Sequence, residues 1–234
     1  MAKNKYLVVT IKSWNIENFE KLKTNDKQNE WHLISDKDDL TYEKLNELKP
    51  RYVFFPHWSW IIPKEIYENF ECIVFHMTDL PFGRGGSPLQ NLISRGVYET
   101  KVSAIRVVQG LDAGDVYCKE PLSIKEGNAN DILKKVSNIT FEKMIPFIIK
   151  NNPVPKKQEG EPTVFKRRTS EQSDISNIDE IKTVYDFIRM LDGEGYPPAF
   201  IETEKLKIEF CNARLDKDQV IADCILKVKK NGKE

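Results

Sequence analysis

The sequence predicts an α/β protein with a mostly parallel sheet, followed by a small C-terminal α+β unit. Short apolar runs alternate with segments whose apolar residues recur at helical spacing, which is the pattern of strands joined by crossover helices. A stretch rich in proline and charge, residues 151–162, then interrupts this pattern. We therefore predict a first domain over residues 1–155 and a smaller second unit over residues 156–234.

The elements of the first domain follow in regular order. Strands are predicted where β-branched and aromatic residues cluster, at residues 6–11, 31–34, 51–55, 72–75, 102–108 and 116–124. Helices are predicted from apolar periodicity at residues 15–23 and 130–150. Two more are predicted at residues 42–48 and at 88–95, the latter because proline is favoured in a first helical turn. Residues 151–162 are expected to form a linker or an ordered surface excursion.

The second unit is expected to hold one helix and three short strands. The helix is predicted over residues 178–191, because apolar side chains recur along one face, and the strands at 199–202, 206–211 and 220–228. The lysine-rich end, KVKKNGKE, is expected to be a solvated tail.

Composition excludes several classes of function. Lys and Arg together number 36, as do Asp and Glu, and this balance argues against a general nucleic-acid binder, which normally carries a basic excess, but it does not exclude a local basic patch. No membrane span or signal peptide is predicted, so we expect a cytoplasmic protein. The four cysteines show no CxxC spacing, so we predict no metal site and reduced thiols. The GxxxxGK[ST] and GxGxxG patterns are absent, which argues against a P-loop and against NAD.

Polar residues capable of chemistry follow three of the predicted strands. These residues are His57, His76 and the pair Asp112 and Asp115. Ligands of open parallel sheets bind beyond the carboxyl ends of the strands. An imidazole there can take or share a proton near neutral pH, provided that an acid orients it. Each residue taken alone is equally compatible with a packing or turn role.

The run HMTDLPFGRGGSP, residues 76–88, and the later run GLDAGD, residues 110–115, together resemble the formyltransferases that use 10-formyltetrahydrofolate. That family's pattern is Asn-x-His-x-Ser-x-Leu-Pro-x-x-Arg-Gly-x-x-Pro, then Asp-x-Gly. The positions that match it here are His76, Thr78, Leu80, Pro81, Arg84, Gly85, Pro88, Asp112 and Gly114. The resemblance implies a Rossmann-like formyltransferase domain, with 10-formyltetrahydrofolate as co-substrate and no metal.

The resemblance implies catalytic roles for His76, Asp112, Thr78 and His57. His76 would accept or relay the proton of the attacking amine, and Asp112 would orient its ring. The family asparagine is Val74 here, so Thr78, His57 or a backbone N–H would have to hold the formyl oxygen. The residues expected to contact the folate are Trp58, Ser59, Trp60, Ile61, Pro81, Arg84, Gly85, Gly110 and Asp115.

The acceptor predicted from resemblance is a nucleotide-linked amino sugar. The run HMTDLPFGRGGSPLQNLI and the C-terminal stretch look most like sugar N-formyltransferases that act on a UDP-linked 4-amino-4,6-dideoxy sugar on the way to pseudaminic-acid-type glycans. Residues expected to contact this acceptor are Trp14, Asn15, Lys166, Arg167, Tyr196 and Phe200, although packing or a cationic surface explains each equally well. The resemblance favours a homodimer, with no nucleic-acid or membrane partner.

Three alternatives stay open at this point. Methionyl-tRNA and glycinamide ribonucleotide are other acceptors used within the family. The short C-terminal unit and the balanced charge disfavour tRNA, whereas the presence of any second unit disfavours glycinamide ribonucleotide. A protein that binds folate or a nucleotide sugar without turnover is the third alternative, because Val74 replaces the family asparagine.

Overall fold

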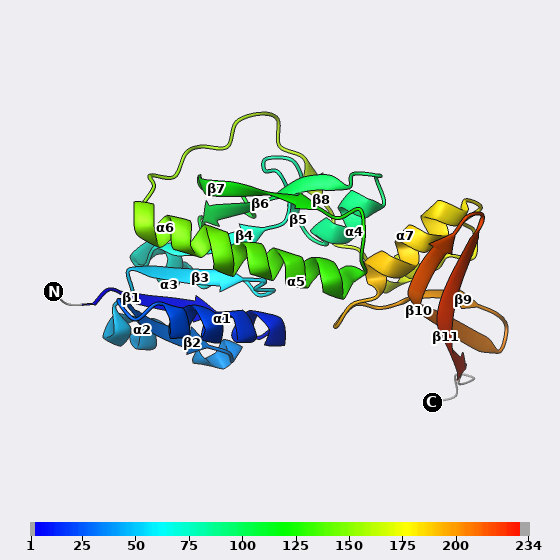
Figure 1. Cartoon of the computed structure of the whole chain (residues 1–234), viewed down its shortest axis with the longest axis horizontal. Coiled ribbons are helices and arrows are strands. Elements are labelled where there is room, and N and C mark those ends of the chain that lie inside the picture. The colour runs from blue at the N-terminus through cyan, green and yellow to red at the C-terminus, as the bar shows by residue number, and fades with distance from the viewer. Residues whose placement is uncertain (1–2, 230–234) are drawn as a thin grey trace. The chain divides into compact units, whose positions relative to one another are not determined.

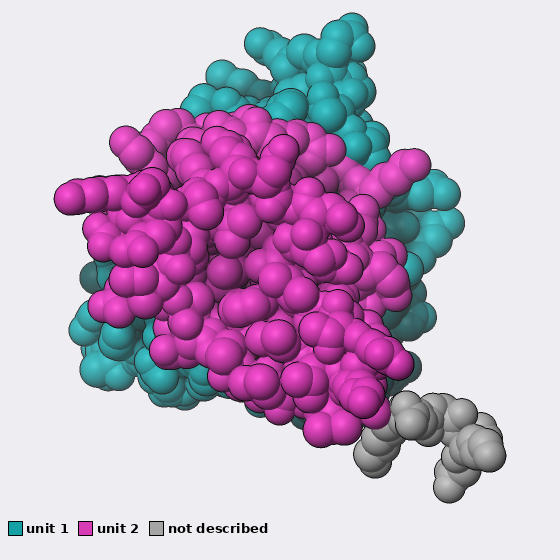
Figure 2. All heavy atoms as spheres, turned by 90° about the vertical axis from the view of Figure 1, so that its right-hand side faces the viewer, with its two compact units in different colours: residues 1–85, 100–122, 134–164 teal, residues 86–99, 123–133, 165–234 magenta. Residues whose placement is uncertain are grey.

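The computed structural model describes residues 3–229 and divides them into two compact units (Figure 2). Unit 1 comprises residues 3–85, 100–122 and 134–164, and unit 2 comprises the remaining described residues. The units therefore interleave along the chain. The domain boundary expected between residues 155 and 156 stays a prediction.

Unit 1 is built on a six-stranded sheet in the order β2-β1-β3-β4-β6-β7 (Figure 1). The strands are β1 (Lys5–Val9), β2 (Glu30–Ile34), β3 (Tyr52–Pro56), β4 (Cys72–His76), β6 (Glu99–Arg106) and β7 (Val116–Ser123). Strand β1 pairs in parallel with β2 and β3, and β3 pairs in parallel with β4. Strand β6 runs antiparallel to β4. The predicted α/β class with a mostly parallel sheet is confirmed.

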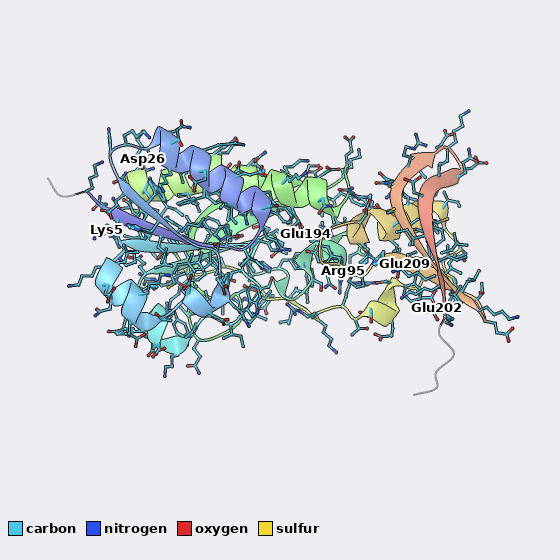
Figure 3. All side chains as sticks on the ribbon, turned by 90° about the horizontal axis from the view of Figure 1, so that it is seen from below. Lys5, Asp26, Arg95, Glu194, Glu202 and Glu209 are labelled. Carbon is cyan, nitrogen blue, oxygen red and sulfur yellow. The ribbon has the colours of Figure 1, made fainter. Side chains whose placement is uncertain are left out.

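Helices cover both faces of this sheet. Figures 1 and 3 show α1, α5 and α6 over one face, and α2 and α3 over the other. Their bounds are α1 (Ser13–Asn25), α2 (Tyr42–Leu48), α3 (Lys64–Asn69), α5 (Ala129–Ile139) and α6 (Ile145–Asn151), with a 3₁₀ turn η1 (Lys37–Asp39) before α2. Sequence periodicity missed α3, which is only six residues long.

The two faces of the sheet have different cores, because successive side chains of a strand point to opposite sides. Leu7 of β1 and Val53 of β3 belong to an aliphatic cluster that also includes Leu45 of α2 and Ile66 of α3. The neighbouring positions form an aromatic layer made of Tyr6, Trp31, Tyr52 and Phe54, and Phe19 of α1 packs edge-on against Trp31. This double burial explains the continuous apolar runs of the parallel strands.

The long helix predicted over residues 130–150 contains a π-helical turn, η2 (Thr140–Met144), between α5 and α6. Pro146 explains why the regular helix changes here, since proline has no N–H to donate to the carbonyl four residues earlier. Asn18 of α1 donates hydrogen bonds to Ser137 and Asn138 of α5, which ties these two helices together.

Residues 152–163 form an ordered excursion over unit 1. Lys156 forms an isolated antiparallel bridge with Val116, and the backbone N–H of Thr163 donates to the carbonyl of Pro81 at 3.1 Å. The carbonyl of Thr163 accepts from the N–H groups of Gly83 and Arg84. These bonds begin a short ladder between β5 (Arg84–Gly85) and β8 (Val164–Phe165), which sequence patterning did not reveal.

Unit 2 contains an antiparallel sheet in the order β11-β10-β9, packed with one helix. Its elements are α4 (Pro88–Ile93), the 3₁₀ turn η3 (Ser170–Ser173), α7 (Ile181–Leu191), β9 (Ala199–Glu202), β10 (Leu206–Asp216) and β11 (Gln219–Val228). The predicted small C-terminal α+β unit is therefore confirmed. The part of the expected tail beyond Lys229 lies outside the described residues. None of the helices among residues 3–229 is both long and apolar enough to cross a membrane.

Candidate active site

The carboxyl ends of β1, β3 and β4 meet at one edge of the sheet, because these strands are parallel and adjacent. Asn15, in the first turn of α1, is buried and joins the ends of β1 and β3: its side-chain amide donates to Thr10 Oγ1 at 3.0 Å and to the Pro56 carbonyl at 3.1 Å. His57 follows β3, and His76 is the last residue of β4. The edge thus collects three of the predicted site residues.

His76 is held between two oxygen atoms and is only 8% exposed. Its Nε2 lies 2.8 Å from the backbone carbonyl of Gly83, and its Nδ1 lies 3.5 Å from Oδ2 of Asp112. A carbonyl can only accept a hydrogen bond, so Nε2 must be the donor in the first contact. The lone pair of a neutral ring then lies at Nδ1, facing the carboxylate.

This arrangement stabilises the ring after it has taken up a proton. Protonation of Nδ1 would convert its contact with Asp112 into a charge-assisted hydrogen bond, while Nε2 keeps its bond to Gly83. A histidine that gains a partner on protonation is suited to receive a proton during a reaction. The pair is therefore a candidate general base with its orienting acid.

Asp112 reaches His76 by a route that the sequence argument did not anticipate. Strand β6 runs antiparallel to β4, with Arg106 opposite Ile73 and Ser103 opposite His76, so β6 ends at the other edge of the sheet. The loop after β6 must return across the sheet to bring Asp112 to the site. Its carboxylate is fixed there because Oδ2 also accepts the N–H of Gly85 at 2.9 Å.

The glycine of the Asp-x-Gly motif has a steric explanation. A Cβ at Gly114 would lie 1.8 Å from the carbonyl oxygen of Arg106, well inside van der Waals contact. Only glycine lets the returning loop pass this close to the end of β6. Asp112 itself has a left-handed backbone with φ of 50°, a conformation that aspartate tolerates better than most residues.

Gln158 braces the site, although sequence reasoning did not identify it. Its side-chain Nε2 donates to the carbonyls of Asp112 and Gly114 at 2.8 and 2.9 Å, and its Oε1 accepts from Nε and Nη2 of Arg84. Arg84 was expected to contact folate, and here it holds Gln158. No local signal marks Gln158, because it lies in a proline- and charge-rich stretch that looks like a solvated linker.

Thr78 and Val74 matter because Val74 stands where the family has an asparagine, and Thr78 is one of the residues predicted to take over its role. The Thr78 hydroxyl donates to the Gly83 carbonyl at 3.3 Å, and the Thr78 carbonyl accepts the hydroxyl of Ser103 at 2.7 Å. Val74 is partly buried and packs against the aliphatic cluster of the sheet. The side chains of Thr78 and His76 therefore share one hydrogen-bond acceptor, the Gly83 carbonyl.

The loop after β3 carries the predicted folate contacts. His57 has a left-handed backbone with φ of 50°, and its ring lies edge-on to Trp14, 6.0 Å between centroids. Trp58 packs against Phe55 and Trp60, and its indole Nε1 is buried without a hydrogen-bond partner. The next residues are open to solvent: Ser59 and Trp60 are exposed, and Ile61 is 94% exposed. An orphaned donor beside exposed apolar residues suits a heterocyclic ligand.

The remaining predicted folate contacts lie in the two loops that frame His76. The Pro81 carbonyl accepts from Thr163, and the Asp115 carbonyl accepts from the N–H of Arg106. Gly85 and Gly110 have φ of 108° and 125°, values that side chains rarely adopt. Both glycines allow backbone to approach a ligand closely.

The other predicted acceptor contacts have varied surroundings. Trp14 in unit 1 is 7% exposed. In unit 2, Lys166 and Arg167 are exposed, whereas Phe200 is 7% exposed and lies beneath Lys207. Burial raises the pKa of Tyr196. Their proposed roles in substrate binding stay predictions.

Comparison with known proteins shows the family. Residues 9–146 match the family model described as "Formyl transferase", and residues 170–227 match the one described as "Methionyl-tRNA formyltransferase, C-terminal domain". The first match covers more than half of the chain, so the chain belongs to the formyl transferase family. The predicted enzyme class is confirmed, and the predicted co-substrate agrees with the folate dependence of this family.

Individual relatives point in the same direction. A structure described as methionyl-tRNA formyltransferase from Clostridium thermocellum is 52% identical, with a TM-score of 0.94 over 97% of this chain and 100% of that one. Methionyl-tRNA formyltransferase from Bacillus cytotoxicus is 32% identical over 64% of this chain, which spans only 50% of that relative's length. HypX from Aquifex aeolicus in complex with tetrahydrofolic acid, at 19% identity and a TM-score of 0.74 over 91% of this chain and 38% of that one, shares the fold.

These findings correct two expectations. The predicted acceptor, a nucleotide-linked amino sugar of the pseudaminic-acid type, is wrong, and so is the expectation that no nucleic acid is involved. The sequence argument took the short C-terminal unit as evidence against tRNA, yet that unit matches the C-terminal domain model of methionyl-tRNA formyltransferases. The argument from balanced charge failed because an average over the whole chain is blind to local basic clusters.

Proposed function

We propose that this protein transfers the formyl group of 10-formyltetrahydrofolate to the amino group of methionyl-tRNA. Formyl transfer is supported chiefly by the His76–Asp112 pair at the edge of the sheet, in which Nδ1 and Oδ2 lie 3.5 Å apart, His76 is buried and Asp112 is partly buried. The names of the relatives and the match over residues 170–227 support methionyl-tRNA as the acceptor. A homodimer and a cytoplasmic location stay predictions.

Folate supplies an activated one-carbon group, and the protein supplies binding, orientation and proton transfer. In the proposed mechanism, Nδ1 of His76 receives the proton that the amine loses as its nitrogen bonds to the formyl carbon. Asp112 then stabilises the imidazolium. The bond between the formyl carbon and the folate nitrogen then breaks, and the imidazolium returns the proton to that nitrogen. General acid–base help of this kind contributes about 10²- to 10⁴-fold. Nearby backbone N–H groups are the proposed donors to the formyl oxygen, a role that Val74 cannot fill. The Thr78 hydroxyl has one donor, so it would join them only by giving up its bond to the Gly83 carbonyl.

The folate site is proposed to lie along the loop after β3. The unpartnered Nε1 of Trp58 offers a hydrogen bond, and Trp60 and Ile61 offer apolar surface. Ser59, Pro81, Arg84, Gly85, Gly110 and Asp115 would complete it. His57, next to Trp58, keeps two possible roles: a donor to the formyl oxygen or a contact of the acceptor.

A formyl-transfer assay tests the proposal directly. The purified chain would be incubated with 10-formyltetrahydrofolate and methionyl-tRNA, and the released amino acid analysed by mass spectrometry for one added formyl group. Free methionine, glycinamide ribonucleotide and a nucleotide-linked amino sugar would be run in parallel. Formylation of methionyl-tRNA alone would support the proposal. Formylation of another acceptor, with no formylation of methionyl-tRNA, would show that methionyl-tRNA is not the acceptor and would still support formyl transfer as the reaction.

A further inference from the structure

Two arginines of unit 2, Arg95 and Arg168, have no carboxylate within ion-pair distance among residues 3–229. Arg95, labelled in Figure 3, donates from Nη1 to the backbone oxygen and Oδ1 of Asn91, at 2.8 and 2.7 Å. Arg168 donates from Nη2 to the carbonyl of Gln172, and its Nε is buried without a partner. Each guanidinium thus keeps N–H donors that no described group accepts.

Both guanidinium groups are held in place by aromatic rings. The guanidinium carbon of Arg95 lies 4.7 Å from the ring centre of Phe165, and that of Arg168 lies 5.2 Å from the ring centre of Phe187. The backbone N–H of Arg168 also donates to the Ser87 hydroxyl at 3.1 Å. Cation–π contacts of this kind fix the plane of the guanidinium and leave its edge free for a ligand.

A chain of hydrogen bonds connects the two arginines. The Ser87 hydroxyl accepts the backbone N–H of Arg168, the Ser87 carbonyl accepts from the side-chain amide of Asn91, and Oδ1 of Asn91 accepts from Arg95. A neighbouring cavity is lined by Ser94, Gly96 and Phe187, and neither arginine lines it.

The acidic side chains that line the cavity are already engaged. Asp186 accepts from Tyr98 at 2.6 Å, from Lys182 at 3.1 Å and from Arg189 at 2.6 Å. Glu180 accepts the hydroxyl of Thr183. Neither carboxylate compensates Arg95 or Arg168.

The uncompensated charge has a cost that an anion would remove. Burial first, and then the neighbouring charge of Arg95, lower the pKa of Arg168. An arginine stays protonated at neutral pH even so. The partly buried Arg168 and the exposed Arg95 therefore repel each other, and a bound anion would turn this repulsion into attraction.

We infer that Arg95 and Arg168 form a binding site for a phosphate group of the acceptor RNA, an inference that rests on the function proposed above. The planar, multi-donor guanidinium matches the oxygens of a phosphate better than a point charge does. The exposed Lys166 and Arg167 directly precede Arg168 and extend the positive charge along the chain. A free phosphate or nucleotide shares this chemistry, so the test must separate it from RNA.

The first arm of the test measures RNA binding by the full chain. Fluorescence anisotropy with a labelled initiator tRNA would compare wild type with Arg95→Gln, Arg168→Gln and the double variant between 50 and 200 mM salt. Each substitution should weaken binding by about tenfold, as expected for a lost hydrogen bond to a charged group. Each should also make the slope of log K against log salt shallower, and the double variant should lose about 0.7 to 0.9 of it in all, because the two arginines bind one phosphate.

Matched controls separate a lost contact from a damaged fold. Arg214→Gln removes a positive charge from an exposed position on β10 and should leave both affinity and slope unchanged. Arg168→Lys retains the charge and should recover most of the salt slope but only part of the affinity. Thermal melts would show that each variant is folded at the temperature of the binding assay.

The second arm uses inorganic phosphate alone. Phosphate should raise the melting temperature of wild type and of Arg214→Gln, but not that of the double variant. Equal tRNA affinity and equal slope in wild type and double variant would overturn the inference while leaving the proposed function intact. Phosphate binding that depends on both arginines, without any tRNA binding by wild type, would reject RNA as the source and count against the proposed function. If phosphate does not raise the melting temperature of wild type, and the double variant binds tRNA as wild type does, the proposed phosphate site is rejected.

Discussion

The candidate chemistry rests on a single contact between two side chains that lie 36 positions apart in the sequence, His76 and Asp112. Asp112 serves two purposes, because one oxygen faces the imidazole and also accepts the N–H of Gly85. It therefore fixes the loop that carries Gly83, whose carbonyl holds the other side of the ring. A change at Asp112 should affect both the charge beside His76 and the orientation of the ring.

Replacement of either residue should stop formyl transfer while the fold persists. His76→Ala removes the proton acceptor, and Asp112→Asn keeps the shape but removes the charge that stabilises the imidazolium, so each should lower kcat by at least about a hundredfold. The measurement is turnover at saturating folate and acceptor, with circular dichroism to check folding. Thr78→Ser keeps the hydroxyl and serves as the control. Near-normal turnover in His76→Ala would remove His76 from the mechanism.

Some residues of the candidate site could be predicted from the sequence and others could not. His76, Asp112 and Gly114 were found because two short motifs carry them, at residues 76–88 and 110–115, and the structure places Nδ1 of His76 3.5 Å from Oδ2 of Asp112. Gln158 was not found, because its role depends on a contact with residues more than 40 positions away and nothing in its own surroundings is unusual. The Gly83 carbonyl was not found either, since backbone groups carry no residue-type signal.

Four elements of unit 1 are tied together by one carboxylate. Glu71, directly before β4, accepts the hydroxyl of Tyr117 in β7 at 2.6 Å, and it accepts from Arg51, before β3, and from Arg106, in β6. Burial alone would raise the pKa of Glu71, but these hydrogen bonds together outweigh it and lower the pKa. The ionised form is therefore the one that the folded state favours.

This pKa shift predicts how stability depends on pH. A carboxylate whose pKa is lower in the folded state adds stability that is fully present above its unfolded pKa, about 4.3 for glutamate. That stability is lost as the pH falls through the lower, folded pKa. Glu71→Gln should thus cost about 2 kcal/mol at pH 7 and progressively less as the pH falls below about 4. Urea denaturation at a series of pH values would measure this.

Glu142→Gln, at an exposed position of η2, is the matched control and should change the free energy of unfolding little at any pH. A destabilisation of Glu71→Gln that stayed constant from pH 7 to pH 3 would contradict ionisation as its cause. In that case the packing of the Glu71 side chain, and not its charge, would be what stabilises the contact between the four strands.

At the level of elements, patterns long enough to show periodicity were predicted well. Helix α2 occupies the predicted residues 42–48, and the strands of the parallel half lie within a residue or two of their predicted positions. The six-residue α3 and the two-residue β5 and β8 are too short for any period to show, whereas the equally short α4 was predicted from the proline in its first turn. The reversal of β6 was also missed, because strand direction depends on the route of the connection and not on the strand's own residues.

For the molecule as a whole, composition set the wrong expectation about the acceptor. A formal charge of zero was taken to disfavour a nucleic-acid partner. Balanced charge limits how many phosphates a surface can neutralise, but it does not prevent a few from being bound at one place. The size of the C-terminal unit was equally uninformative, because a small antiparallel sheet with one helix fits more than one family branch.

The same charge balance makes a quantitative prediction for the whole chain. If RNA is bound chiefly through Lys166, Arg167 and the pair Arg168 and Arg95, which share one phosphate, about three phosphates are contacted, and the slope of log K against log salt should be about −2 to −3. This dependence is shallow for an RNA-binding protein, because no excess of positive charge adds further, unspecific contacts. The slope would be obtained from fluorescence anisotropy of labelled tRNA that carries no amino acid, measured with the full chain between 50 and 300 mM salt. A slope of −6 or steeper would mean that basic residues far outside this cluster take part, and a slope near zero would mean that phosphates contribute little to binding.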